Sequence, residues 1–62
     1  MPSAREMEII KMLSKGLINK DIAETLRLSP YTVKRHIENI YKKLKVHNRV
    51  ELMLKVNKKE RH

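Results

Sequence analysis

The dipeptide Ser29-Pro30 is the feature that most constrains how this chain of 62 residues can fold. Proline disfavours helical geometry in the residue before it, and its fixed φ and missing N–H suit the first position of a helix. Serine is also a good N-cap, so the pair predicts that one helix has ended and that another begins at Pro30. Residues 19–36 are therefore expected to form a short helix, a tight corner and a capped second helix.

Capping patterns predict two helices ahead of this corner. Residues 3–6 read Ser-Ala-Arg-Glu, a capping-box pattern that opens a helix over 4–15. Gly16, the only glycine of the chain, closes this helix at a position where a left-handed backbone is favoured. A two-turn helix follows over 20–27, with Asn19 as its expected N-cap.

The third predicted helix, over 30–44, has two faces of different chemistry. Its apolar face consists of residues at i, i+4, i+7 and i+11, namely Val33, Ile37, Ile40 and Leu44. The same spacing on the opposite face gives Tyr31, Arg35, Glu38 and Lys42. We therefore expect one side of this helix to pack inward and the other to face solvent.

A fourth helix is predicted over 49–57, after a second capping-box pattern at 48–51, and a frayed tail is expected over 58–62. Its apolar residues cover about 200° of arc at 100° per residue, which is too wide for one core contact. One part is expected to pack on the domain's own core. The rest, assigned to Leu52, Met53 and Val56, is expected to pair with a second copy or, alternatively, to dock on another domain of a longer protein.

Four helices without a strand signal predict an all-α fold, namely one compact four-helix domain over residues 1–62 with a helix-turn-helix and no wing. The chain has no cysteine, which excludes disulfides and cysteine-based zinc sites, and its histidines lack metal-ligand spacing. No metal or cofactor is therefore expected. No apolar run approaches the roughly 20 residues needed to cross a bilayer, so no membrane partner is expected.

The positive charge is concentrated in the second half of the chain. Residues 1–28 carry five Lys and Arg against four Asp and Glu, whereas residues 29–62 carry ten against three. A one-sided positive field attracts polyanions such as nucleic acid, although a solubilising surface or acidic-lipid binding gives the same composition. No nucleophile–base pair, catalytic carboxylate pair or phosphate-binding glycine loop is present, so the chain is not expected to be an enzyme.

Three stretches resemble the LuxR/GerE-type helix-turn-helix, and together they cover about residues 3–53. Their central motifs are Gly16-Leu17-x-Asn19-Lys20-Asp21-Ile22-Ala23, Leu28-Ser29-x-x-Thr32-Val33-Lys34-x-His36 and Asn48-Arg49-x-Glu51. The resemblance implies a cytoplasmic DNA-binding domain of a bacterial transcription regulator, acting at the nucleoid. It implies sequence-specific binding to double-stranded promoter DNA, with the helix over 30–44 in the major groove, and a homodimer that forms through the last helix.

Four residues on the outward side of that helix are candidates for contact with bases. Arg35 is the first choice, because a guanidinium can bind guanine O6 and N7 together. Lys34 is expected at a base edge or a phosphate. Glu38 either accepts a hydrogen bond from cytosine N4 or pairs with Lys42 at i, i+4, and the ion pair is slightly favoured. Lys42, with the adjacent Lys43, is expected to add nonspecific attraction to phosphates.

Four other residues are candidates for contact with the DNA backbone. Tyr31 and Thr32 lie in the first turn of the helix over 30–44, where their hydroxyls can bond phosphates beside the positive helix N-terminus. Asn19 and Lys20 begin the preceding helix and resemble phosphate contacts of the family. For Asn19 this use competes with its expected role as a cap.

The chain departs from the family pattern at Arg27 and Lys45, where the family often has glycine. Both positions follow a helix, where a left-handed backbone is expected, and a residue other than glycine costs about 1 kcal/mol there. Because both replacements are basic, we hypothesise that phosphate contact offsets this cost.

Two other interpretations stay open at this point. A sigma-factor-like promoter-reading domain has a similar helix-turn-helix, and binding to RNA polymerase would favour it. A helical protein-interaction module that uses the last helix is the second, and failure to bind any duplex would favour that one.

Overall fold

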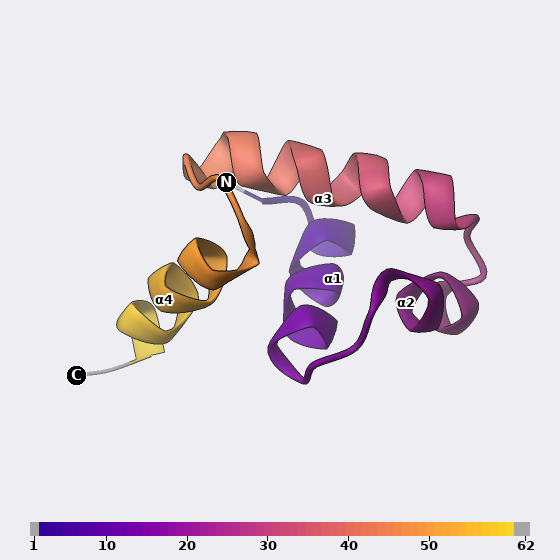
Figure 1. Ribbon diagram of the computed structural model, residues 1–62, viewed down its shortest axis with the longest axis horizontal. Coiled ribbons are helices and arrows are strands. Elements are labelled where there is room, and N and C mark those ends of the chain that lie inside the picture. The colour runs from indigo at the N-terminus through magenta and orange to yellow at the C-terminus, as the bar shows by residue number, and fades with distance from the viewer. Residues whose placement is uncertain (1, 61–62) are drawn as a thin grey trace.

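Residues 2–60 form four helices and no strand in the computed structural model, which describes side chains through residue 57. The helices are α1 (Ala4–Ser14), α2 (Asn19–Leu26), α3 (Pro30–Leu44) and α4 (Arg49–Glu60). Figure 1 shows α3 across one side of the molecule, α1 and α2 beneath it, and α4 on the opposite side of α1 from α2. The predicted all-α fold with a helix-turn-helix at α2–α3 is therefore confirmed.

The bounds of α3 are those predicted, whereas the other helices differ at their ends. Helix α1 ends at Ser14, and α2 spans Asn19–Leu26. The N-cap of α2 is Ile18, whose N–H is accepted by Asp21 Oδ2 at 3.4 Å, so the prediction of Asn19 as the cap is wrong.

Helix α4 continues to Glu60, so the predicted end of the helix at residue 57 is three residues too early, while fraying of the tail stays a prediction. Residues 58–60 are Lys, Lys and Glu, which are good helix formers and give the helix no reason to stop at residue 57. Residues 61–62 lie outside the described part of the chain.

The caps at the starts of α1 and α3 follow from the sequence. Ser3 Oγ accepts the Glu6 N–H at 3.2 Å, and Glu6 Oε1 accepts the Ser3 N–H at 2.9 Å, which completes the predicted capping box. Ser29 Oγ accepts the Thr32 N–H at 3.1 Å, with a proline in the first turn. Gly16 has a φ of 89°, so the left-handed end predicted for α1 is also confirmed.

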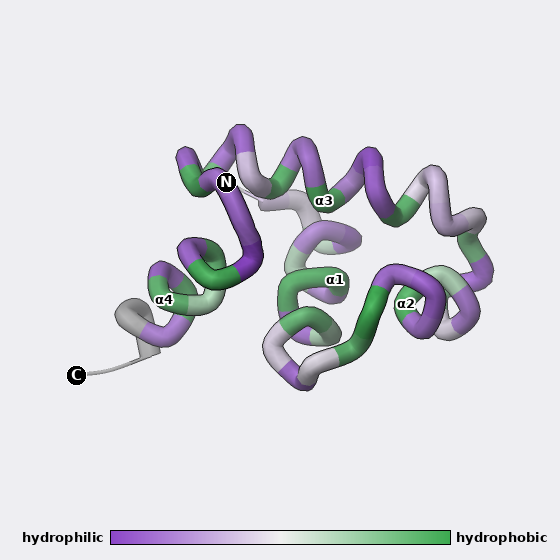
Figure 2. Tube along the Cα trace, viewed as in Figure 1, coloured by the Kyte–Doolittle hydropathy of each residue, from purple (hydrophilic) through white to green (hydrophobic). Residues whose placement is uncertain are grey.

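The core lies between α3 and the other three helices, and Figure 2 shows the apolar segments on the facing sides. On α3, Val33 and Ile40 are fully buried, Ile37 is nearly so and Leu44 is partly buried against the core, which confirms the predicted apolar stripe. The other buried apolar residues are Ile9, Ile10, Leu13, Ile22, Ala23, Val46 and Leu52. Each large buried side chain contributes about 1.5–3 kcal/mol by leaving water. Because this stripe is held against the core, the opposite side of α3 faces solvent.

Three basic side chains of the C-terminal half bind groups of the domain itself, and we call Lys43, Arg49 and Lys55 the inner cations. Arg49 Nη2 donates to the Leu13 carbonyl at 2.8 Å, and Lys55 Nζ donates to the Leu44 carbonyl at 2.6 Å. Both carbonyls lie at helix C-termini, where the helix dipole favours a positive charge. These two bonds join α4 to the ends of α1 and α3.

The third inner cation, Lys43, binds a buried carboxylate. Glu6 is only 4% exposed, and its Oε1 atom lies 2.8 Å from Lys43 Nζ. The hydrogen bond from Lys43, and then the one from the Ser3 N–H, hold the pKa of Glu6 below its ordinary value of 4.5. The Lys43 ammonium is thus bound within the domain, and its attraction to phosphates stays a prediction.

Candidate nucleic-acid interface

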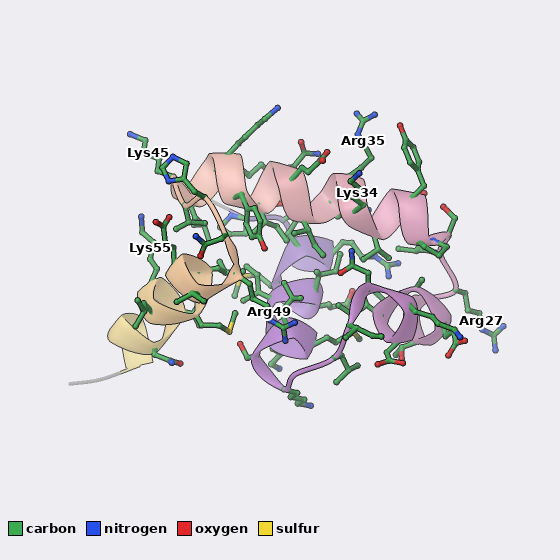
Figure 3. The ribbon with its side chains drawn as sticks, viewed as in Figure 1. Arg27, Lys34, Arg35, Lys45, Arg49 and Lys55 are labelled. Atoms are coloured by element: carbon green, nitrogen blue, oxygen red, sulfur yellow. The ribbon has the colours of Figure 1, made fainter. Side chains whose placement is uncertain are left out.

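The side chains predicted on the outward side of α3 are all exposed. They are Tyr31, Lys34, Arg35, Glu38 and Lys42. Figure 3 shows the Arg35 side chain directed away from the other three helices. We call Lys34, Arg35, Lys42 and Lys45 the outer cations, because all four are exposed and form no ion pair with any other side chain of residues 2–57.

Arg35 and Tyr31 lie one helical turn apart and touch. Arg35 Nη1 donates to the Tyr31 hydroxyl at 3.3 Å, and the Tyr31 side chain is 66% exposed. The guanidinium keeps its other N–H groups for an incoming acceptor, and the tyrosine hydroxyl keeps its own proton to donate. The i, i+4 spacing places both residues on one face but did not by itself predict this contact.

The ion pair that the sequence favoured between Glu38 and Lys42 does not form. Both side chains are exposed, and the ion pairs among residues 2–57 join other partners. An exposed ion pair at this spacing is only slightly lower in free energy than two separately solvated charges, so the two side chains have little reason to stay paired. The Glu38 carboxylate is thus left as an acceptor on the outward face of α3.

The four candidates for backbone contact lie at the starts of α2 and α3. Thr32 is half-buried, and its hydroxyl lies 2.9 Å from Ser29 Oγ. Tyr31 precedes it in the same turn. Asn19 and Lys20 are exposed in the first turn of α2, and neither side chain has a hydrogen bond within the described residues. Since Ile18 is the cap, the Asn19 amide is not occupied by that role.

Arg27 and Lys45 both have the left-handed backbone that was expected of them. Each is the C-cap of its helix with a φ of 58°, and both are exposed. Figure 3 places Arg27 at the α2–α3 corner and Lys45 at the other end of α3. Helix α3 therefore has at each end a basic residue in a backbone conformation that glycine adopts more readily.

The apolar residues assigned to a dimer contact on α4 require a correction. Leu52 is fully buried in its own domain, and Met53 and Val56 are half-buried against that core. The exposed apolar residues are instead Val50, 68% exposed, and Leu54, 65% exposed, one helical turn apart. The wide apolar arc signalled two contacts, but the sequence did not show which side would turn inward.

The described residues were also compared with the requirements of a metal site and of a membrane-spanning helix. Among them no group of three or more His, Cys, Asp or Glu side chains is arranged to hold a metal ion. Within the same part of the chain, no helix has the length and apolar character to cross a membrane.

Comparison with known proteins identifies a family for this chain. The family model for bacterial regulatory proteins of the luxR family matches residues 3–56. The fimbriae Z protein of Escherichia coli K12 is 51% identical over 51 residues, which is 82% of this chain and 24% of that protein. A nitrate/nitrite response regulator protein homolog of Haemophilus influenzae is 50% identical over 46 residues, 74% of this chain and 22% of that protein.

A solved structure has the same fold. The response regulator ChrA of a heme-sensing two-component system superposes with a TM-score of 0.89 at 40% identity. The match covers 97% of this chain but 30% of that chain. The present chain thus spans less than a third of the length of each of these three proteins.

Proposed function

Because this chain belongs to the luxR family of bacterial regulatory proteins, it is a DNA-binding domain that serves transcription regulation, and we propose that α3 is its recognition helix. The observation that carries the proposal is the division of α3 into a buried stripe and an exposed face with Lys34 and Arg35 near its start. The major groove of B-DNA is about 12 Å wide and admits one α-helix. The exposed face then enters the groove of double-stranded promoter DNA while the buried stripe stays packed.

Sequence choice comes from the side chains that reach base edges. Arg35 is placed by Tyr31 and keeps enough free N–H groups to bind guanine O6 and N7 together. Lys34 contacts a base edge or a phosphate beside it. Glu38, which has no cation partner among the described residues, is the candidate acceptor for cytosine N4.

Affinity comes mainly from phosphates, and these contacts orient the domain on the duplex. Tyr31 and Thr32 lie at the positive N-terminus of α3, which favours an anion. Asn19 and Lys20 have the same place at the start of α2. Lys42 adds a cation farther along α3. The mechanism is equilibrium binding, and no catalytic step is part of it.

A second copy of the chain is the proposed partner at α4. Val50 and Leu54 supply an exposed apolar surface, Met53 and Val56 are half-buried candidates on the same helix, and Leu52 is left out because it has no exposed surface. A two-fold pair would place two recognition helices about one DNA turn, or 34 Å, apart. Sedimentation at rising concentration tests this, and a monomer at every concentration would instead leave α4 to a different domain or protein.

We place this activity in the bacterial cytoplasm, at promoters in the nucleoid, where RNA polymerase is a further partner of a transcription regulator. A direct and tight complex with core RNA polymerase would instead favour the sigma-factor-like interpretation. A pull-down with core RNA polymerase, with and without promoter DNA, distinguishes a transcription regulator from a sigma-factor-like domain.

Selection of bound sequences from a random duplex pool tests the proposed function. Performed at two salt concentrations, it is expected to enrich a split motif with two-fold symmetry, and the enrichment should persist at the higher salt. Binding without any enriched sequence would show phosphate attraction alone. No binding even at low salt would favour a protein-interaction module.

A further inference from the structure

A hollow lies at the C-terminal end of α3, and the turn that ends the helix forms it. Its lining consists of Glu38, Tyr41, Lys42, Lys45, Val46 and His47. The Val46 N–H donates to the Tyr41 carbonyl at 2.9 Å, and the Lys45 N–H donates to the Lys42 carbonyl at 3.3 Å. Val46 is buried and Tyr41 half-buried, so these residues are held in place while both lysine side chains are exposed.

The charges around the hollow favour an anion, although a helix C-terminus ordinarily repels one. The Leu44 carbonyl at this end already accepts a hydrogen bond from Lys55 Nζ at 2.6 Å, which offsets the negative end of the helix dipole. The His47 ring and N–H lie 3.2 and 2.7 Å from Glu51 Oε1, so that carboxylate is occupied. The lining itself then includes two lysines, Lys42 and Lys45, and one glutamate, Glu38.

The backbone of Lys45 is a second, independent observation. Its φ of 58° and ψ of 45° lie in the left-handed region, which costs a side-chain-bearing residue free energy that glycine avoids. Many helices end on a left-handed residue, but glycine is the usual choice there, so a lysine is the costlier one. Here the strained residue is an exposed lysine that lines the hollow.

The geometry points to a DNA backbone-phosphate site in this hollow, formed by the ammonium groups of Lys42 and Lys45. This inference rests on the proposed function of α3. At 1.5 Å per residue, Lys42 and Lys45 lie about 10 and 15 Å along the helix from Arg35. The major groove is about 12 Å wide, so a helix that reads a base at Arg35 brings its end to the phosphates at the groove's edge.

The variant Lys45→Gly tests whether Lys45 contacts a phosphate or is only a residue that the turn tolerates. Glycine relieves the strained backbone, so the temperature of unfolding should rise. Loss of the phosphate contact should weaken binding to a selected duplex about fivefold at 0.15 M salt, and more at lower salt, with a salt slope smaller by about one. Thermal unfolding and fluorescence anisotropy across a salt series measure the two effects, which have opposite signs.

Two further variants isolate the cause. Lys45→Ala keeps the left-handed strain and removes the ammonium group, so it should weaken binding as much as the glycine variant without gaining stability. Lys15→Ala removes the same charge from the exposed end of α1, remote from α3, and should bind nearly as the wild type does.

The inference is overturned if Lys45→Gly keeps the wild-type affinity and salt slope, or if Lys15→Ala loses as much affinity as Lys45→Gly. In either case the duplex affinities of the wild-type chain and of Arg35→Ala still show whether α3 is the recognition helix. A wild-type chain that binds no duplex but does bind an acidic peptide overturns the proposed function and this site together.

Discussion

The basic residues of the C-terminal half whose side chains the structure describes form two sets that composition does not distinguish. The inner cations bind oxygens of the domain itself, and their partners are Glu6, Leu13 and Leu44. The outer cations Lys34, Arg35, Lys42 and Lys45 are exposed and unpaired among the described side chains. The contrast shows that part of the positive charge stabilises the fold, so the net charge overstates the cationic surface that is available to DNA.

The division falls between adjacent residues of α3. Lys42 is exposed and lines the hollow, whereas Lys43, the next residue, reaches the buried Glu6 of α1. One residue along a helix is a rotation of about 100°, which is enough to move a side chain from one face to another.

The largest effect is expected from the outer set at Arg35. Arg35→Ala removes the bidentate base contact, so affinity for the selected duplex should fall by about 2–3 kcal/mol, or 30–150-fold, and preference at one base position should relax. Stability should change by less than about 0.5 kcal/mol, because the side chain is exposed. Anisotropy on matched and mismatched duplexes, with urea unfolding, measures both. If Arg35→Ala were unfolded or clearly destabilised, Arg35 would belong with the inner cations, and its assignment to the outer cations would be wrong.

The adjacent lysines give the sharpest comparison between the sets. Lys43→Ala leaves the buried Glu6 carboxylate without its ammonium partner, so the free energy of unfolding should fall by about 2 kcal/mol. Lys42→Ala should leave stability unchanged and weaken duplex binding about fivefold at 0.15 M salt. Urea unfolding and binding of the fully folded fraction are measured for both variants. If both lose affinity equally and neither loses stability, the division is wrong.

The pH dependence of stability tests the inner set without removing a cation. The pKa of Glu6 is lowered in the folded state, chiefly by Lys43, so its contribution is present above about pH 4.5 and is lost as the pH falls through the folded pKa. The stability difference between the wild type and Glu6→Gln should therefore shrink on acidification below that pH. The pKa of Glu51, lowered by the His47 N–H, affects both proteins alike. A difference that stays constant from pH 7 to pH 3 would contradict the ion pair.

The smallest effect is expected at the α2–α3 corner. Arg27→Gly relieves the φ of 58° and should stabilise the domain by about 1 kcal/mol. Because Arg27 does not line the hollow at the other end of α3, its duplex affinity should fall less than that of Lys45→Gly. Thermal unfolding and anisotropy, run beside Lys45→Gly, make the comparison. If Arg27→Gly and Lys45→Gly lost the same affinity, both ends of α3 would contact phosphates, as hypothesised from the sequence.

Local features of the fold were predictable because they depend on neighbours in the chain. The bounds of α3 follow from Ser29-Pro30 at its start and from a stripe that repeats through Leu44. The capping box at Ser3 and the left-handed Gly16 are likewise set within a few residues. The outward face of α3 was predictable for the same reason, because periodicity fixes which side chains lie opposite the stripe.

The contacts that the sequence did not predict join distant parts of the chain. Lys43 and Glu6 are 37 residues apart, and Arg49 and Leu13 are 36 apart, so no local pattern marks them. The wide apolar arc of α4 was visible, but which part became core depended on where α1 and α3 lie. That is why Leu52 was assigned to a partner and Val50 and Leu54 were not.

The central claim is that DNA binds the outer face of α3, and NMR titration of the wild-type chain with the selected duplex tests it most directly. The largest chemical-shift changes are expected at Tyr31, Lys34, Arg35 and Lys42, with Lys45 next, while the side-chain signals of Lys43 and Arg49 stay near their free values. Largest changes on α1 or α4, with the outer face of α3 unshifted, would contradict the account.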